Sequence, residues 1–189
     1  MVINLCLLFY YNNSDEFDPE LCGRNFVISN NDKTMLYQGF YWQTCYGKKV
    51  ISSTMNGIYI WKLKIISTKI ATTVIGIDDA EANWGNYKYF RSTSKAWYGY
   101  NVILGWIYKP PIDSPEVDIK KGFPIGARRQ NSIITMKLII NDNQSILTFK
   151  NNDGEEFIAC DHVKREDGLE YRLAISSSYK SCSFQILKS

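Results

Sequence analysis

The segment GIYIWKLKI, residues 57–65, alternates between two kinds of side chain with a period of two. One side of an extended chain would carry the apolar residues Tyr59, Trp61, Leu63 and Ile65. The other side would carry Lys62 and Lys64, together with Ile58 and Ile60. Such a period is typical of a β-strand and does not match a helix. The segment therefore predicts a strand whose aromatic face, with Trp61, is buried.

Further segments are rich in β-branched and aromatic residues and are bounded by Asn, Asp and Gly. They are 25–29, 72–77, 132–140, 145–149, 155–160, 171–176 and 182–187. The stretches NDNQ at 141–144 and NNDG at 151–154 predict tight turns between neighbouring strands. Many short strands without a long helix predict an all-β fold, namely a two-sheet antiparallel β-sandwich with little helix.

The chain length favours a single domain. With 189 residues, 45% hydrophobic and 22% charged, the chain can bury one core of ordinary composition. We expect one domain over 1–189, with 1–16 as an N-terminal extension or an edge strand. The apolar start MVINLCLLFYY lacks a preceding basic residue and a following small-residue cleavage site, so it is a poor signal peptide. It is also too short for a membrane span, and we expect no membrane association.

The net charge and the cysteine pattern limit which classes of partner and which cellular compartment the sequence predicts. A net charge of +3 does not imply a polyanionic partner, so nucleic acid is not indicated. The cysteines are odd in number, widely spaced and without a C-x-x-C pair; they are Cys6, Cys22, Cys45, Cys160 and Cys182. This pattern argues against a disulfide framework and against a zinc site. We therefore predict a cytoplasmic or nuclear protein whose thiols mostly pack as small apolar side chains.

A search for catalytic or metal-binding sets finds little. His162 is the single histidine and follows Asp161, but no Ser or Cys elbow lies nearby in the sequence. A turn histidine is therefore favoured over a member of a catalytic triad. The acidic stretch 78–85 fails the calcium-loop pattern, since Trp84 stands at the glycine position and Phe90 at the closing glutamate position. We expect no enzyme activity, no cofactor and no metal.

Aromatic residues are dense between Trp84 and Trp106, where they alternate with basic residues. Rigid aromatics next to polar loops are typical of protein recognition surfaces. At least half of them should fill the core, and Trp97 is expected to be one of these. Stacking on single-stranded nucleic acid is the weaker hypothesis at this net charge. The following segment, 105–124, holds four of the five prolines and predicts a surface excursion.

Taken in order, these motifs resemble a SPRY domain, the module also found in B30.2-type proteins. The resemblance runs through 17–37, Gly57 with Trp61, VIGI at 74–77, KAWYGYN at 95–101, the long hairpin 136–160 and the closing strands 171–187. It departs from the family pattern at three places. NNDG has one extra residue, Lys62 replaces an acidic residue, and 105–124 is long and rich in proline. These departures bear on loop shape and partner choice.

The resemblance implies a concanavalin-like scaffold that binds a protein or short linear peptide through loops at one edge. Matching by motif, the partner-binding residues would be Ile66, Ser67, Thr68, Lys69, Asn86, Tyr87, Ser178 and Tyr179. Asn86 stands where peptide-binding SPRY adaptors have Tyr, so their specificity does not transfer. We expect a monomeric interaction module, serving as the recognition part of a larger assembly such as a ubiquitin ligase or a scaffold. The alternatives are a lectin-like carbohydrate binder and, less favoured, a hydrolase that uses His162.

Overall fold

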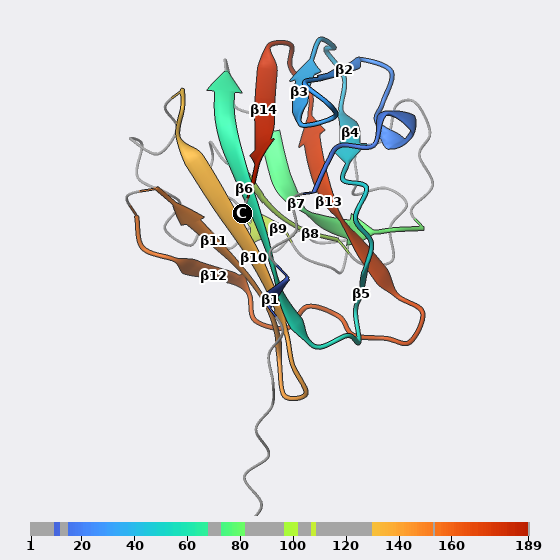
Figure 1. The fold of residues 1–189 in the computed structure, drawn as a ribbon, viewed down its shortest axis with the longest axis vertical. Helices are drawn as coiled ribbons and strands as arrows, with labels where there is room; N and C mark the ends of the chain where they lie inside the picture. Colours follow the sequence, from blue (N-terminus) through green and yellow to red (C-terminus); the bar gives the residue numbers. More distant parts are fainter. Residues whose placement is uncertain are drawn as a thin grey trace, which may run out of the picture.

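Two β-sheets lie one over the other and enclose the core between them (Figure 1). The computed structural model describes residues 10–11, 15–67, 73–81, 97–101, 107–108, 130–152 and 154–188. The larger sheet contains β1 (Tyr10–Tyr11), β2 (Phe26–Ser29), β3 (Thr34–Tyr37), β6 (Gly57–Ser67), β10 (Ile133–Ile140), β11 (Ser145–Asn151), β12 (Phe157–Cys160) and β14 (Cys182–Leu187). The smaller sheet contains β4 (Gln43–Tyr46), β5 (Ile51–Ser52), β7 (Thr73–Asp79), β8 (Trp97–Asn101), β9 (Ile107–Tyr108) and β13 (Glu170–Ser177).

The strand order makes β6 the middle of the larger sheet. This sheet runs β12-β11-β10-β6-β14-β3-β2, with β1 beside β6, and the smaller one runs β4-β13-β7-β8-β9, with β5 beside β13. Neighbouring strands are antiparallel, apart from the short parallel pair of β1 and β6. A single 3-10 turn, η1 (Pro19–Leu21), is the helical element among the described residues. The predicted all-β, two-sheet antiparallel sandwich is confirmed.

The inner face of β6 is the one that the sequence predicts. Tyr59, Trp61, Leu63 and Ile65 are at most 3% exposed and belong to the core. The indole nitrogen of Trp61 donates a hydrogen bond of 2.9 Å to the buried carboxylate of Asp15. This bond satisfies the indole N–H inside the core and attaches the segment before η1 to the central strand.

The predicted strand segments all form strands, and both predicted turns are present. Asn141 closes the first turn, because its backbone N–H donates to Gln144 and its side chain accepts from two backbone N–H groups. Gly154 closes the second by donating to the carbonyl of Asn151. Trp97 is buried, at 1% exposed, but it lies outside the core between the sheets that it was expected to fill. The sequence analysis missed β3, β4, β5 and β8; it also missed β9, which lies inside the predicted excursion.

The cysteine prediction is wrong for one pair. Cys22 and Cys45 form a disulfide across 23 residues of sequence, whereas Cys160 and Cys182 are buried and not disulfide-bonded. The two partners meet because the chain after η1 runs along β4, where the N–H of Gly23 donates to the carbonyl of Thr44. Spacing along the sequence could not reveal this proximity, since β4 was not recognised. The predicted packing of thiols in the core holds for Cys160 and Cys182.

Within the described residues, the structure has no helix with the length and apolar character that a membrane crossing requires.

Candidate functional site

Three segments that are distant in sequence meet at one end of the sandwich. They are the loop between β3 and β4 (38–42), the end of β6 (66–67) and the turn between β13 and β14 (178–181). The hydroxyl of Ser67 donates to the carbonyl of Ser181 at 2.5 Å, and the N–H of Ser181 donates to the carbonyl of Tyr37 at 2.8 Å. The turn is therefore bonded to both neighbouring segments, at the upper end of β14 in Figure 1.

Two large aromatic side chains at this end project into solvent. Phe40 is 60% exposed and Tyr41 is 67% exposed, which are the highest values among the exposed large hydrophobic residues described. The rings of Phe40 and Tyr179 meet edge to face, with centroids 6.2 Å apart and planes at 87°. The ammonium of Lys180 lies 5.0 Å from the centre of the Phe40 ring. We call Phe40, Tyr41, Tyr179 and Lys180 the aromatic edge.

A buried tyrosine holds the backbone of the loop that carries Phe40 and Tyr41. The hydroxyl of Tyr37, which is fully buried, donates to the carbonyl of Tyr41. Burial raises the pKa of the Tyr37 phenol, so this group stays a neutral donor. A Cβ at Gly39 would lie 2.4 Å from the Tyr37 hydroxyl and 2.6 Å from the side-chain nitrogen of Asn25. A larger residue at position 39 would therefore displace the side chain of Tyr37 or Asn25, and the hydrogen bond from Tyr37 holds the backbone that carries the exposed rings.

The aromatic edge carries aromatic rings and one cation. Residues 38–42, 66–67 and 178–181 contain no carboxylate, histidine or cysteine, and their single charged group is Lys180. Paired aromatic rings and a cation offer contact area and cation–π attraction. They do not supply a nucleophile with a general base.

The predicted site residues divide into two groups. Ile66, Ser67, Ser178 and Tyr179 are half-buried, and the structure brings the strands that carry them together, with Ser67 paired to Ser183 of β14. Thr68, Lys69, Asn86 and Tyr87 lie outside the described residues. The sequence analysis missed Phe40 and Tyr41. The signal available was the run Phe40-Tyr41-Trp42 directly after a glycine, between two polar residues.

His162 does not form part of a catalytic set with its described neighbours. Its Nδ1 lies 3.1 Å from Asp161, and both side chains are largely exposed. An isolated backbone bridge pairs it with Ser145, a residue that the sequence analysis did not connect with it. The Ser145 hydroxyl is buried without a hydrogen-bond partner, while the histidine ring points to solvent. A nucleophile and base must share a hydrogen bond, so this arrangement is not a triad.

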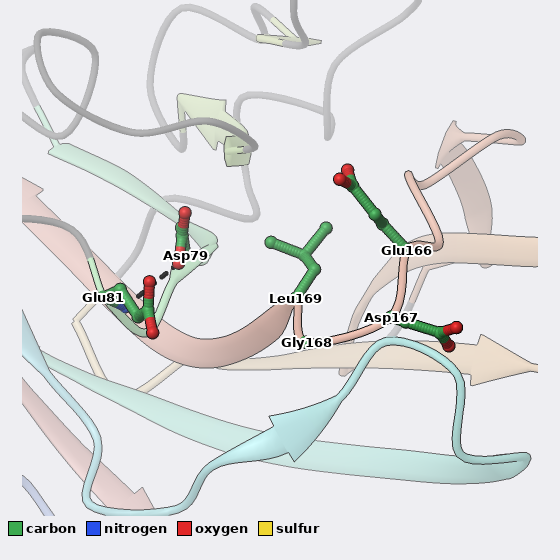
Figure 2. A pocket seen from close by; sticks show the side chains of 6 residues that line it. All are labelled: Asp79, Glu81, Glu166, Asp167, Gly168 and Leu169. Carbon is green, nitrogen blue, oxygen red and sulfur yellow. Dashed lines mark hydrogen bonds between the residues drawn. The ribbon is translucent and has the colours of Figure 1, made fainter.

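A small acidic pocket lies at the opposite end of β13 (Figure 2). Its volume is about 110 Å³, and it is lined by Asp79, Glu81, Glu166, Asp167, Gly168 and Leu169. Asp79 already accepts a hydrogen bond from the N–H of Glu81, and the side chains of Glu166 and Asp167 point in different directions. Ligand pockets usually exceed about 300 Å³. Among the described residues, no three His, Cys, Asp or Glu side chains are placed to hold a metal ion.

Comparison with known proteins identifies the fold. No protein-family model and no curated protein matches the sequence. Solved structures do match. The SPRY domain of human HERC1 aligns with a TM-score of 0.67 at 17% identity, covering 91% of this chain and 97% of that one. The PRY-SPRY domain of TRIM65 aligns with a TM-score of 0.62 at 11% identity, covering 95% of this chain and 94% of that one. The chain therefore has the fold of a SPRY domain.

Proposed function

We propose that this chain is a non-catalytic module that binds a partner protein or a short linear peptide through the aromatic edge. SPRY domains are typically protein-interaction modules and generally lack catalytic activity. The observation that carries the proposal is the exposure of Phe40 and Tyr41, at 60% and 67%, on a loop whose backbone is fixed.

Exposed rings on a fixed backbone favour binding for an energetic reason. Aromatic anchors contribute large contact area while losing little rotamer freedom, and they dominate many protein interfaces. The edge-to-face contact with Tyr179 orders Phe40 before a partner arrives. Less conformational entropy is then lost on binding. A partner ring or aliphatic side chain could pack against this pair, and an acceptor group could approach Lys180.

The test begins with identification of a partner by affinity capture and mass spectrometry, followed by calorimetry with the purified partner. The double variant Phe40→Ala/Tyr179→Ala should lose about 2 kcal/mol or more of binding free energy. Its circular dichroism spectrum and melting temperature should stay close to wild type, since both side chains lie in loops. The matched control is Ile158→Ala, which truncates a side chain that is 51% exposed on β12.

Equal affinities of the wild type and the folded double variant would overturn the proposal. Selective retention of glycans on an array, without a protein partner, would instead support the lectin-like alternative. Tyr87 stays predicted to face Tyr179 across the same edge, and Tyr87→Ala tests that separately. We also predict that the module is the recognition part of a larger assembly, such as a ubiquitin ligase or a scaffold. The composition of the captured complex tests this prediction.

The Cys22–Cys45 disulfide argues against the predicted cytoplasmic or nuclear location, because structural disulfides are rare in reducing compartments. Imaging of the tagged full chain in its own cells tests that prediction.

A further inference from the structure

The outer face of the larger sheet is a second surface, distinct from the aromatic edge. On β6 the side chains of Lys62 and Lys64 alternate with buried core residues and are partly exposed. The strand register places Lys62 between Thr135 of β10 and Leu187 of β14. Thr135 is paired in turn with Lys150 of β11, which is exposed. The three lysines thus lie on one face across three neighbouring strands.

These lysines have like charge, and no described carboxylate is paired with Lys62 or Lys64. Lys62 and Lys64 are two residues apart on one strand, which puts their Cα atoms about 6.6 Å apart. None of the three forms an ion pair with a residue in the described part of the chain. The carboxylate of Glu156 is bonded to Lys137 at 2.9 Å and to Thr148, and it also attracts Lys150. The face therefore keeps a positive charge at Lys62 and Lys64 that the described carboxylates do not neutralise.

Apolar side chains lie beside Lys62 and Lys64. Ile133 is paired with Lys64, and Leu187 with Lys62; both are partly exposed. The outward positions of β6, β10, β11 and β14 contain Ile, Lys, Thr, Ser, Gln and Leu, with no arginine and no aromatic residue. The outward residues of these four strands are therefore lysines, aliphatic residues and small polar residues, and Tyr10 of β1 is paired with Ile58 of β6 in the same sheet.

We propose that this basic face, defined by Lys62, Lys64 and Lys150, binds an acidic surface of a partner protein. Carboxylates on the partner would neutralise the like charges, and its aliphatic groups could cover Ile133 and Leu187. Single-stranded nucleic acid is the poorer fit, because its bases stack on aromatic rings, and the outward positions of the three strands that carry the lysines have none. A membrane surface is also a poorer fit, because electrostatic binding to anionic lipids usually takes a cluster of about four to eight basic residues, and binding by insertion takes a larger apolar face.

The probe is a poly-L-glutamate peptide, titrated into the isotope-labelled full chain and followed through its amide resonances. We expect shifts confined to 60–64, 133–137 and 148–150, with an affinity that falls as salt is added. The triple variant Lys62→Gln/Lys64→Gln/Lys150→Gln should weaken binding by about tenfold or more. The matched control Lys48→Gln/Lys49→Gln/Lys164→Gln loses the same number of charges outside the basic face and the aromatic edge, and it should bind as wild type does.

Three results would overturn the proposal: no shifts on the basic face, an equal loss in both triple variants, or tighter binding of a thymidine oligonucleotide or phosphatidylserine vesicles at equal salt. The variant Phe40→Ala/Tyr179→Ala should retain poly-L-glutamate binding. A failure of the basic face is thereby distinguishable from a failure of the aromatic edge.

Discussion

The two sheets differ in how many of their faces are buried. In the larger sheet, β10 alternates strictly between partly exposed and buried residues, and β6 does so from Tyr59 to Lys64. In the smaller sheet, β7 and β8 are buried at every position. Several buried residues of the smaller sheet lie outside the core between the sheets; they include Val74, Trp97 and Ala174. The larger sheet can therefore present side chains to partners along its outer face, whereas β4, β7 and β8 of the smaller sheet are buried on both faces.

The inner faces of both sheets pack against the core, so truncating a large side chain there should have the largest effect on stability. Trp61→Ala removes a side chain that is 3% exposed and leaves a cavity under β6. We expect a loss of about 3 to 5 kcal/mol of unfolding free energy, measured by denaturant unfolding. An unchanged melting temperature would mean that the assigned register of β6 is wrong.

The outer faces should differ sharply. Ala174 of β13 is fully buried between Tyr46 and Gly76, so Ala174→Lys would bury a charge without a planned partner. The expected loss of unfolding free energy, measured by denaturant unfolding, is about 3 kcal/mol. The matched change Thr34→Lys, at a partly exposed position of β3, should alter stability by no more than about 0.5 kcal/mol. Similar losses at both positions would remove the distinction between the sheets.

A smaller effect is expected at the link between Asp15 and Trp61. One carboxylate oxygen accepts from the indole of Trp61, and the other accepts from the backbone N–H groups of Glu16 and Lys49. Burial raises the pKa of this carboxyl, although these donors act in the opposite direction. Asp15→Asn would turn an NH2 group toward one set of donors and should cost about 1 to 2 kcal/mol. The exposed control Asp167→Asn should be neutral by the same unfolding measurement.

The smallest effect is expected on the basic face. Lys62→Gln/Lys64→Gln relieves repulsion between like charges and should raise stability by no more than about 0.5 kcal/mol. Thermal unfolding at low and high salt should show that the gain disappears as the charges are screened. A loss of stability instead would indicate that these lysines form ion pairs important to the fold.

The contrast between the sheets also explains what the sequence could predict. Strands β6 and β10 were found because one exposed face leaves alternation in the sequence. The segments QTCY of β4 and WYGYN of β8 are buried at every position, so they lack alternation and were missed. The disulfide was missed for the same reason, since Cys45 lies in β4. Gly76 of β7 shows how close the packing is, because a Cβ there would meet the carbonyl oxygen of Tyr98 at 1.9 Å.

The candidate site was only partly predictable. Family resemblance pointed to Ser67 and Tyr179 because they follow recognisable strands. It could not point to Phe40, which belongs to the edge through a ring contact with Tyr179 and through the bond from Tyr37 to the backbone of Tyr41. Both contacts join segments that are distant in the sequence or unrecognised as strands. The exposure of an aromatic side chain depends on the folded structure and cannot be read from the amino-acid sequence.

The most direct test of the account is a hydrogen-exchange footprint of the captured partner on the full chain. Binding at the aromatic edge predicts slower exchange at 38–42, 66–67 and 178–181, with 166–169 around the acidic pocket unchanged. The same footprint in the Phe40→Ala/Tyr179→Ala variant should be lost at equal concentrations. Protection centred on 166–169, or spread over the sheets without the three edge segments, would contradict the claim that this fold binds its partner through the aromatic edge.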